Sequence, residues 1–303
     1  MTISNSPVGK VSVPDVVAHR GFSARYPENT MQAYRKAVEA GTTGLEGDIR
    51  LTKDGEVIMM HDLTLDRTTT GSGPIKDHNW HGDIENLVTK KGQQPVPRFI
   101  EVLELLISNE VDDNMYMVVD IKFDNPLKIL DALHELFQHE SIQPHIPTLK
   151  KRLIIGIWDS TFLARSKELF EGFRFCFIGL SLEAARTNYL YSCDAVSLHF
   201  AILASSEGQA YIKEAHALQK RVFCWTINKV EQMETCVAWG VDAVIGDNIP
   251  LLLEHVHENI KHLTYEEFAM FVKSCKYPGI LGRLHYRITQ FIMQCVSSLY
   301  IGA

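Results

Sequence analysis

Apolar and polar residues follow two different periods along most of the chain. From residue 15 onward, short apolar runs alternate with longer stretches in which apolar side chains recur every three or four positions. The short runs predict strands and the longer stretches predict helices. The predicted strands are Val16–His19, Leu45–Leu51, Tyr116–Ile121, Leu153–Ile157, Phe175–Leu180, Ala195–Leu198, Val222–Ile227 and Ala243–Ile245. The predicted helices are Glu28–Ala40, Phe99–Ile107, Leu127–Phe137, Phe162–Phe170, Gln209–Leu218 and Val230–Trp239.

This order of elements predicts an α/β protein with a parallel sheet, because strands and helical segments alternate. Eight strands in about 240 residues match the size of a TIM (β/α)8 barrel. A doubly wound open sheet gives the same alternation, so the periodicity leaves both folds open and the strand count favours the barrel. We expect a barrel domain over residues 15–260, an N-terminal tail over residues 1–14 and a separate C-terminal helical segment over residues 261–303.

A hairpin interrupts the alternation after the second predicted strand. Asp54-Gly55 lies between two apolar runs, and this dipeptide favours the two-residue type I′ turn. Such a turn pairs position 48 with position 61, which places Asp48 beside His61. Residues 63–97, which follow, are polar, rich in Thr, Gly and His, and lack a helical period. A long insertion of this kind at a strand end is usually functional or mobile.

Three acidic residues lie near the ends of predicted strands. Glu46 and Asp48 are two positions apart on one strand, so their side chains share a face, and Asp120 with Lys122 repeats this spacing on the third strand. The C-terminal ends of barrel strands form the active site of TIM barrels. Three carboxylates that converge there need a cation, and oxygen ligands favour Mg²⁺ or Ca²⁺ over Zn²⁺. Alternatively, Glu46 and Asp48 are solvated and paired with neighbouring basic residues.

A histidine and an arginine follow the first predicted strand directly. His19 at a strand end can donate or accept a proton near neutral pH, and the guanidinium of Arg20 has donors suited to phosphate. Pro27-Glu28-Asn29-Thr30 then opens the next helix, and His61-Asp62 ends the hairpin. A lone histidine is more often a packed core or surface residue, so only the combination of these positions indicates a catalytic site.

The combination resembles the glycerophosphodiester phosphodiesterase family. The motifs that carry the resemblance are His-Arg-Gly (19–21), Pro-Glu-Asn-Thr (27–30), Glu-x-Asp (46–48), Asp-Gly (54–55), His-Asp (61–62) and Arg-Thr-Thr (67–69). Looser matches are Asp120-Ile121-Lys122, Trp225-Thr226-Ile227-Asn228 and Gly246-Asp247-x-x-Pro250, so the resemblance covers residues 15 to about 255. Ile157-Trp158-Asp159, Ser197-Leu198-His199-Phe200 and the apolar C-terminal segment look like the fungal phosphatidylglycerol-specific phospholipase C branch of the family.

The resemblance implies a TIM barrel with an insertion after the second strand and a divalent metal, Mg²⁺ or Ca²⁺, at its mouth. Carried over by position, it implies an acid–base pair of His19 and His61, metal ligands Glu46, Asp48 and Asp120, and phosphate contacts Arg20 and Lys122. We expect His19 to act as the base and His61 as the leaving-group acid. The family usually has glutamate where this chain has Asp120, so the metal either lies closer to this strand or binds Asp120 through water.

Two further residues are candidates for the substrate pocket. Trp225 lies at the end of the seventh predicted strand and is a candidate cover for the glycerol or for a lipid chain, and His199 is a second candidate. Packing in the barrel core or at its rim explains either residue about equally well.

The expected reaction is phospholipase C-type cleavage of a glycerophospholipid, such as phosphatidylglycerol, to diacylglycerol and glycerol phosphate. Water or the neighbouring glycerol hydroxyl is the nucleophile. Three alternatives stay open: a soluble enzyme that releases glycerol 3-phosphate from deacylated diesters, phospholipase D-type cleavage on the other side of the phosphate, and an inactive lipid-binding barrel. Both histidines and all three acidic positions are filled, which opposes the last alternative.

Composition and charge exclude several classes of protein. Apolar residues make up 46% of the chain and charged residues 22%, which argues against a disordered, fibrous or multi-span membrane protein. The net charge of −7 argues against a nucleic-acid partner. Six scattered cysteines predict free thiols in a reducing compartment. Residues 1–14 lack the apolar region of a secretory signal. We therefore expect an intracellular protein.

The C-terminal segment, residues 261–303, has five basic and two acidic side chains in an otherwise acidic protein. Ile288, Phe291, Ile292, Cys295 and Leu299 form an apolar stripe with helical spacing. The stripe is too short and too polar for a membrane span. We therefore expect a helix on the cytoplasmic surface of an organelle membrane or on a lipid droplet. A helix packed on the barrel gives the same pattern, and the sequence carries no signal for an oligomeric state.

Overall fold

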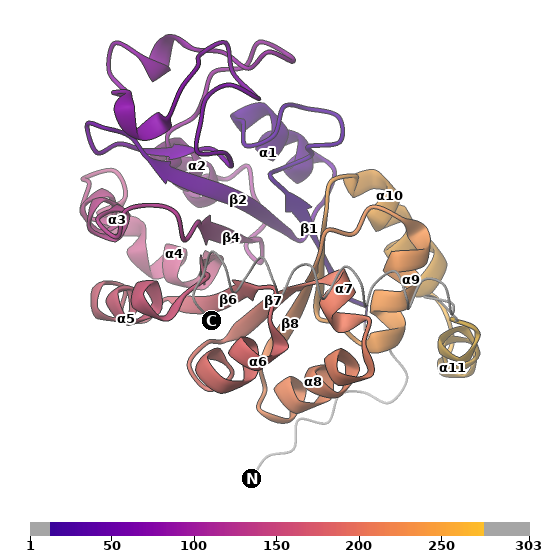
Figure 1. Cartoon of the computed structure of the whole chain (residues 1–303). Coiled ribbons are helices and arrows are strands. Elements are labelled where there is room, and N and C mark those ends of the chain that lie inside the picture. Colours follow the sequence, from indigo (N-terminus) through magenta and orange to yellow (C-terminus); the bar gives the residue numbers. More distant parts are fainter. Residues whose placement is uncertain (1–12, 276–303) are drawn as a thin grey trace.

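Eight parallel strands close into a barrel that is surrounded by helices (Figure 1), in a computed structural model that describes residues 13–275. The barrel strands are β1 (Asp15–His19), β2 (Gly44–Leu51), β4 (Tyr116–Ile121), β5 (Leu153–Ile157), β6 (Arg174–Gly179), β7 (Ala195–His199), β8 (Arg221–Trp225) and β9 (Ala243–Gly246). β1 pairs with β9 on one side and with β2 on the other. This pairing closes the sheet, so the expected TIM barrel is confirmed and the open sheet is excluded.

Helices cover the outside of the barrel. They are α1 (Met31–Glu39), α2 (Phe99–Ile107), α3 (Ile129–Phe137), α4 (Ile146–Arg152), α5 (Ser160–Leu169), α6 (Leu182–Ala184), α7 (Phe200–Leu203), α8 (Ser206–Ala217), α9 (Val230–Trp239), α10 (Ile249–Leu253) and α11 (Tyr265–Ser274). Side chains alternate along each strand: Val16 and Ala18 pack in the layer under the helices, whereas Val17 packs inside the barrel. Burial on both faces explains why the strands read as continuous apolar runs.

Capping and length explain where the predicted helices differ from the observed ones. The helix predicted from residue 28 begins three residues later, because the Thr30 hydroxyl accepts the backbone N–H of Ala33 and ends the loop before it. The sequence pattern missed α4, α6, α7 and α10. Each has fewer than eight residues, which is too short to show a helical period.

The predicted register of the hairpin is wrong by one residue. β3 (Val57–Met59) pairs antiparallel with β2, and the backbone N–H of Met60, not of His61, donates to the carbonyl oxygen of Asp48 at 2.9 Å. The cause is a three-residue loop, closed by the Thr52 N–H on the Glu56 carbonyl. Within that loop only Gly55 has a positive φ, +93°, whereas a type I′ turn needs two such residues.

The insertion, residues 63–97, forms an ordered lobe at the end of β2 (Figure 1). It contains two 3₁₀ turns, Ile75–Asp77 and Ile84–Asn86. Its small apolar core is shared with the hairpin before it and consists of Ile58 and Met60 from the hairpin with Leu65, Ile75, Trp80, Ile84 and Val96 from the insertion. This core orders a segment in which the sequence shows no helical period.

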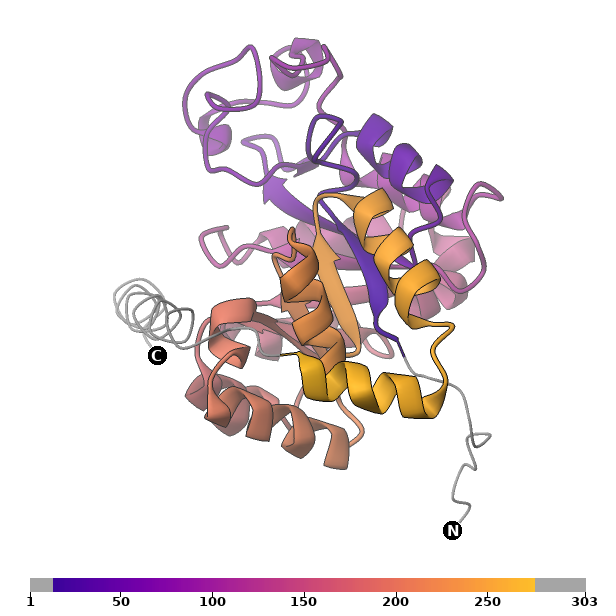
Figure 2. The same cartoon turned by 90° about the vertical axis from the view of Figure 1, so that its right-hand side faces the viewer.

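The C-terminal segment is described only as far as residue 275. Its helix α11 packs through Phe268 and Phe271 near Val237 and Val13, and Figure 2 shows it beside α9, close to where the chain enters β1. The predicted apolar stripe lies outside the described residues. Over residues 13–275, no helix combines the length and apolar character needed to cross a membrane. The cysteines of this part of the chain are free, as expected.

Candidate active site

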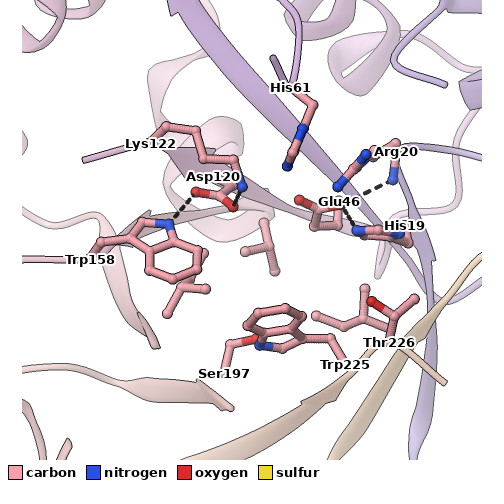
Figure 3. Close-up of a pocket in the computed structure, with 13 residues that line it drawn as sticks. His19, Arg20, Glu46, His61, Asp120, Lys122, Trp158, Ser197, Trp225 and Thr226 are labelled. Carbon is pink, nitrogen blue, oxygen red and sulfur yellow. Dashed lines mark hydrogen bonds and ion pairs between the residues drawn. The ribbon is translucent and has the colours of Figure 1, made fainter. Parts of the chain in front are cut away.

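A pocket of about 170 Å³ lies inside the barrel at the C-terminal ends of the strands (Figure 3). One side of the pocket is charged and is lined by His19, Arg20, Glu46, His61, Asp120 and Lys122. The other side is largely apolar and is lined by Val118, Trp158, Ile178, Trp225 and Ile245, with Ser197 and Thr226. The position matches the general location of active sites in TIM barrels.

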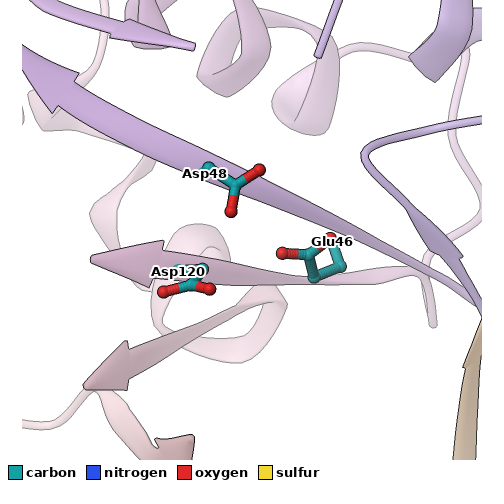
Figure 4. A group of neighbouring side chains, drawn as sticks. All are labelled: Glu46, Asp48 and Asp120. Atoms are coloured by element: carbon teal, nitrogen blue, oxygen red, sulfur yellow. The ribbon is translucent and has the colours of Figure 1, made fainter. Parts of the chain in front are cut away.

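Three carboxylates meet on the charged side (Figure 4). Glu46 and Asp48 lie on β2, and Asp48 is level with Asp120 on the neighbouring strand β4. Each contributes an oxygen atom, and these atoms lie within 4.8 Å of one another. All three side chains are buried, with exposed fractions of 5% or less. The structure therefore brings together the three acidic residues that the sequence indicates, although Asp120 is shorter than the usual glutamate.

Two basic side chains hold the carboxylates together. Lys122 Nζ lies 2.5 Å from Asp120 Oδ2 and 2.9 Å from Asp48 Oδ1, and Arg20 Nε lies 3.3 Å from Asp48 Oδ2. Burial by itself raises the pKa of Asp48, but the charges of Lys122 and Arg20 outweigh it and lower that pKa far below its usual range. The two positive charges therefore favour the ionised form of Asp48.

Glu46 has the opposite electrostatics. Burial and the negative charge of Asp48 raise its pKa to about 7, against the opposing effect of His19 and Arg20. The Glu46 carboxylate also accepts the backbone N–H of Arg20 at 3.0 Å. Three buried oxygen donors within 4.8 Å of one another fit a hard divalent cation such as Mg²⁺ or Ca²⁺.

The Pro-Glu-Asn-Thr motif orients the central carboxylate. Asn29 donates its side-chain N–H to Asp48 Oδ2 at 2.8 Å, and its carbonyl oxygen accepts the Tyr34 hydroxyl at 2.7 Å. All three side chains are buried. Gly47 leaves the room for this contact, because a Cβ there would lie 2.1 Å from the Tyr34 hydroxyl oxygen. The structure thus explains the glycine between the two acidic residues of β2.

His19 is held by the carboxylate of Asp247, which directly follows the neighbouring strand β9. Its Nδ1 lies 2.6 Å from Asp247 Oδ1, and its Nε2 lies 4.0 Å from Glu46 Oε2. Asp247 itself accepts hydrogen bonds from the Ser23 hydroxyl at 3.0 Å and the Asn228 amide at 2.6 Å. Burial lowers the pKa of His19, but the Asp247 hydrogen bond and the Glu46 charge outweigh it, so the pKa is raised.

His61 is held in the same way by its own neighbour. Its Nδ1 lies 2.7 Å from Asp62 Oδ1. Burial and the positive charges of Arg20 and Lys122 lower the pKa of His61, although Asp48 opposes them. Nδ1 of each histidine therefore faces a carboxylate, and both rings line the pocket.

Arg67 of the insertion connects the two halves of the charged side. Its guanidinium binds both oxygens of Asp62, at 2.6 and 2.8 Å, and both oxygens of Glu28, at 2.8 Å each. Glu28 in turn accepts a hydrogen bond from Arg20 Nη1 at 3.0 Å. The Arg-Thr-Thr motif thus ties the insertion to the partner of His61 and to the partner of Arg20.

Of the two pocket candidates, Trp225 lines the pocket and His199 is not among the lining residues. His199 Nδ1 accepts the backbone N–H of Ala201 at 3.2 Å and caps α7. Its ring packs edge-to-face on Trp225, with the centroids 5.1 Å apart, and burial lowers its pKa to about 4. These contacts place His199 behind Trp225 as a packing and capping residue.

Sequence reasoning assigned no role to several residues that the structure places at the site. Trp158 and Ser197 line the pocket, and Asn29 and Asp247 hydrogen-bond to residues of the charged side. Asn29 and Asp247 lie in the motifs that carry the family resemblance, and this was the only sequence signal for them. Their partners are distant along the chain, so the contacts become visible only in the folded barrel.

A TIM barrel whose mouth combines a buried acidic triad, two histidines and two basic side chains has the features of a metal-dependent phosphoric diester hydrolase. The chain matches the model of the glycerophosphoryl diester phosphodiesterase family over residues 19–251 and belongs to that family. Members of this family depend on a divalent metal, and the acidic triad is where this chain can bind one. The expected family is therefore confirmed.

The names of similar proteins agree with this family. A glycerophosphodiester phosphodiesterase of Bacillus altitudinis is 27% identical over 241 residues, which covers 77% of this chain and 94% of the relative. Glycerophosphodiester phosphodiesterase 1 of Bos taurus is 27% identical over 254 residues, which covers 71% of this chain and 72% of the relative.

Solved structures share the fold. The structure of an Oleispira antarctica phosphodiesterase in complex with the product sn-glycerol-3-phosphate has a TM-score of 0.66 at 20% sequence identity. The superposition covers 80% of this chain and 96% of that chain. The structure of the glycerophosphodiester phosphodiesterase of Thermotoga maritima has a TM-score of 0.63 at 24% sequence identity. The superposition covers 80% of this chain and 97% of that chain.

Proposed function

We propose that the protein hydrolyses glycerophosphodiesters to sn-glycerol 3-phosphate and an alcohol. The observation that carries this proposal is the placement of His19 and His61 around one acidic triad, each ring held through Nδ1 by a carboxylate. The names of the bacterial and mammalian relatives support this substrate class. So does the product bound to the Oleispira antarctica enzyme. These comparisons favour deacylated diesters over the phospholipid expected from the sequence.

In this proposal, Glu46, Asp48 and Asp120 hold Mg²⁺ or Ca²⁺, which supplies Lewis-acid polarisation of the phosphoryl oxygens. Arg20 and Lys122 line the same pocket and add positive charge where negative charge develops during the reaction. Burial of these groups strengthens their attraction for a phosphate, because the local dielectric is lower than in water.

The two histidines transfer the protons. One accepts the proton of the nucleophile, and the other donates a proton to the leaving alkoxide. Because Nδ1 of each ring faces a carboxylate, Nε2 is the nitrogen that reacts. The order expected from the sequence, with His19 as base and His61 as acid, stays a prediction. Attack by the neighbouring glycerol hydroxyl gives a cyclic phosphate first, whereas attack by water gives the open phosphate directly.

A second candidate is phospholipase C-type cleavage of phosphatidylglycerol. The apolar wall of the pocket, which includes Trp158, Ile178 and Trp225, supports this candidate because it offers contact for the carbon chain of an acylated glycerol. The membrane-binding helix within residues 261–303, and a location on the cytoplasmic side of an organelle membrane or on a lipid droplet, belong to this candidate and stay predictions.

The test compares soluble glycerophosphoglycerol with phosphatidylglycerol vesicles, each with Mg²⁺, with Ca²⁺ or with EDTA, and identifies the products by mass. Metal-dependent glycerol 3-phosphate from the soluble diester supports the first proposal. Diacylglycerol and glycerol phosphate from vesicles support the second, and phosphatidic acid indicates phospholipase D-type cleavage. His19→Ala serves as the control for contaminating activity. No turnover of either substrate with either metal overturns both proposals and supports an inactive lipid-binding barrel.

A further inference from the structure

The pocket contains two tryptophans whose indole N–H groups have different surroundings. Trp158 follows β5 and donates its Nε1–H to Asp120 Oδ1 at 2.7 Å. Trp225, at the end of β8, lines the same pocket, but its buried Nε1 has no hydrogen-bond partner within residues 13–275. Figure 3 shows the nitrogen of Trp158 aimed at Asp120, whereas Trp225 lies across the apolar side.

Asp120 is the carboxylate of the triad that contacts both Lys122 and Trp158. Glutamate and aspartate differ by one methylene, and the resemblance leads us to expect glutamate at this position. In the structure both oxygens of Asp120 are engaged, Oδ1 by Trp158 and Oδ2 by Lys122 Nζ at 2.5 Å. Lys122 follows β4 and Trp158 follows β5, so the two donors approach the carboxylate from different places and together restrict its plane. A carboxylate oxygen has two lone pairs, so the indole hydrogen bond leaves capacity for a further ligand.

Trp158 is itself held rigidly enough to act as a fixed donor. Its ring packs edge-to-face on Trp225 with centroids 6.1 Å apart and lies 6.0 Å from the ring of Phe123. Lys122 Nζ lies 5.2 Å from the Trp158 ring centroid. Aromatic and cation contacts of this kind restrict the orientation of the ring. The indole is therefore oriented by the pocket wall and not by Asp120 alone.

We propose that Trp158 is a positioning residue for the metal site. Its indole N–H directs the short Asp120 side chain toward Glu46 and Asp48, so that an aspartate serves where the family usually has a glutamate. The inference rests on the proposed function, because it assumes that the triad binds a divalent cation. Removing a residue that hydrogen-bonds to a metal ligand and orients it typically weakens metal binding 10- to 100-fold.

The experiment measures Mg²⁺ and Ca²⁺ binding to the metal-stripped full chain by calorimetry. Trp158→Phe keeps an aromatic ring and removes the donor, and we expect 10- to 100-fold weaker binding. Trp239→Phe is the matched control, because the ring of Trp239 stacks on Phe200 with centroids 5.0 Å apart and is not among the residues that line the pocket, and we expect its affinity to stay within threefold of the wild type. Trp158→His, which retains a ring N–H, should bind more tightly than Trp158→Phe.

A double-mutant cycle tests the link to side-chain length. In the Asp120→Glu background, Trp158→Phe should cost less metal affinity than in the wild type, because the longer side chain depends less on the indole. Equal costs in both backgrounds, or equal losses in Trp158→Phe and Trp239→Phe, overturn the inference. If wild type binds metal and hydrolyses diesters but Trp158→Phe binds normally, only the inference fails. If wild type binds neither cation, the proposed metal site fails and the inference fails with it.

Thermal melts test whether a variant loses metal affinity only because it no longer folds. Trp158→Phe should unfold cooperatively, with a near-UV spectrum that differs from wild type only by the loss of one indole. If Trp158→Phe fails to fold, Trp158→His and Trp158→Tyr are compared instead. The tyrosine hydroxyl lies at a different place on the ring from the indole N–H. Normal metal affinity in Trp158→His with a tenfold loss in Trp158→Tyr supports the same conclusion. Equal affinities in these two variants contradict it.

Discussion

Replacing Lys122 by methionine tests the electrostatics of the acidic triad most directly. Lys122 Nζ lies between Asp48 Oδ1, at 2.9 Å, and Asp120 Oδ2, at 2.5 Å. The side chain of Lys122 is 12% exposed and those of its two partners 1% and 5%. Methionine has a similar length and no charge. The variant therefore leaves two buried carboxylates without their shared counter-charge and changes the shape of the pocket little.

The size of the effect follows from the burial of the pair. Removing one partner of a buried ion pair costs about 3–5 kcal/mol. Arg20 stays 3.3 Å from Asp48 and Trp158 still donates to Asp120, so we expect the lower end, about 3 kcal/mol, in the metal-free protein. At about 2–4 °C per kcal/mol, the melting temperature should fall by about 6–12 °C at pH 8.

The assay is thermal unfolding of Lys122→Met and wild type with EDTA and with increasing Mg²⁺. A divalent cation in the triad replaces the lost charge, so saturating Mg²⁺ should narrow the gap between the two proteins by linkage. Lys36→Met is the control, because Lys36 makes a similar contact with Glu39, at 2.6 Å, on the surface, and its removal should leave the melting temperature unchanged.

Two results would refute this reasoning. If metal-free Lys122→Met melts within 2 °C of wild type, Lys122 does not neutralise the triad. If Lys122→Met is destabilised but Mg²⁺ leaves the gap unchanged, the three carboxylates are not the metal site.

Three further predictions concern the groups around the triad. Asp247→Asn removes the charge beside His19 Nδ1, so kcat should fall at least tenfold with a smaller change in KM. Because the pKa of Glu46 is raised above its unfolded value, the folded metal-free protein binds an extra proton; wild type should therefore lose stability relative to Glu46→Gln as the pH rises from 5 to 8. Arg67→Lys cannot form the paired contacts with Asp62 and should lower kcat/KM about tenfold at an unchanged melting temperature.

Each of these predictions has a result that contradicts it. Steady-state kinetics that show unchanged kcat for Asp247→Asn remove that residue from any role in positioning His19. Melts of wild type and Glu46→Gln that stay parallel from pH 5 to 8 show that Glu46 titrates as in the unfolded chain. A large fall in the melting temperature of Arg67→Lys assigns the residue to stability instead of to the active site.

Local patterns determined much of the fold. Apolar runs of strand length occur wherever a barrel strand is buried on both faces, and helical periods occur where a helix is long enough to show one. The same patterns missed α4, α6, α7 and α10, whose few residues stay helical because they pack against neighbouring elements. They also missed the hairpin register, because the number of residues in the loop depends on the hydrogen bonds of Thr52 and not on the Asp54-Gly55 pair alone.

For the candidate site, too, the sequence predicts some features and the fold adds others. The type and spacing of Glu46, Asp48 and Asp120 on two strands predict an acidic cluster at one end of a parallel sheet. The distant groups that contact these residues are apparent only in the folded barrel. Closure of the barrel places Asp247 against His19, 228 positions away, and brings Trp158 to Asp120. Contacts between residues so far apart depend on the relative placement of whole strands, and no local pattern of residues records that placement.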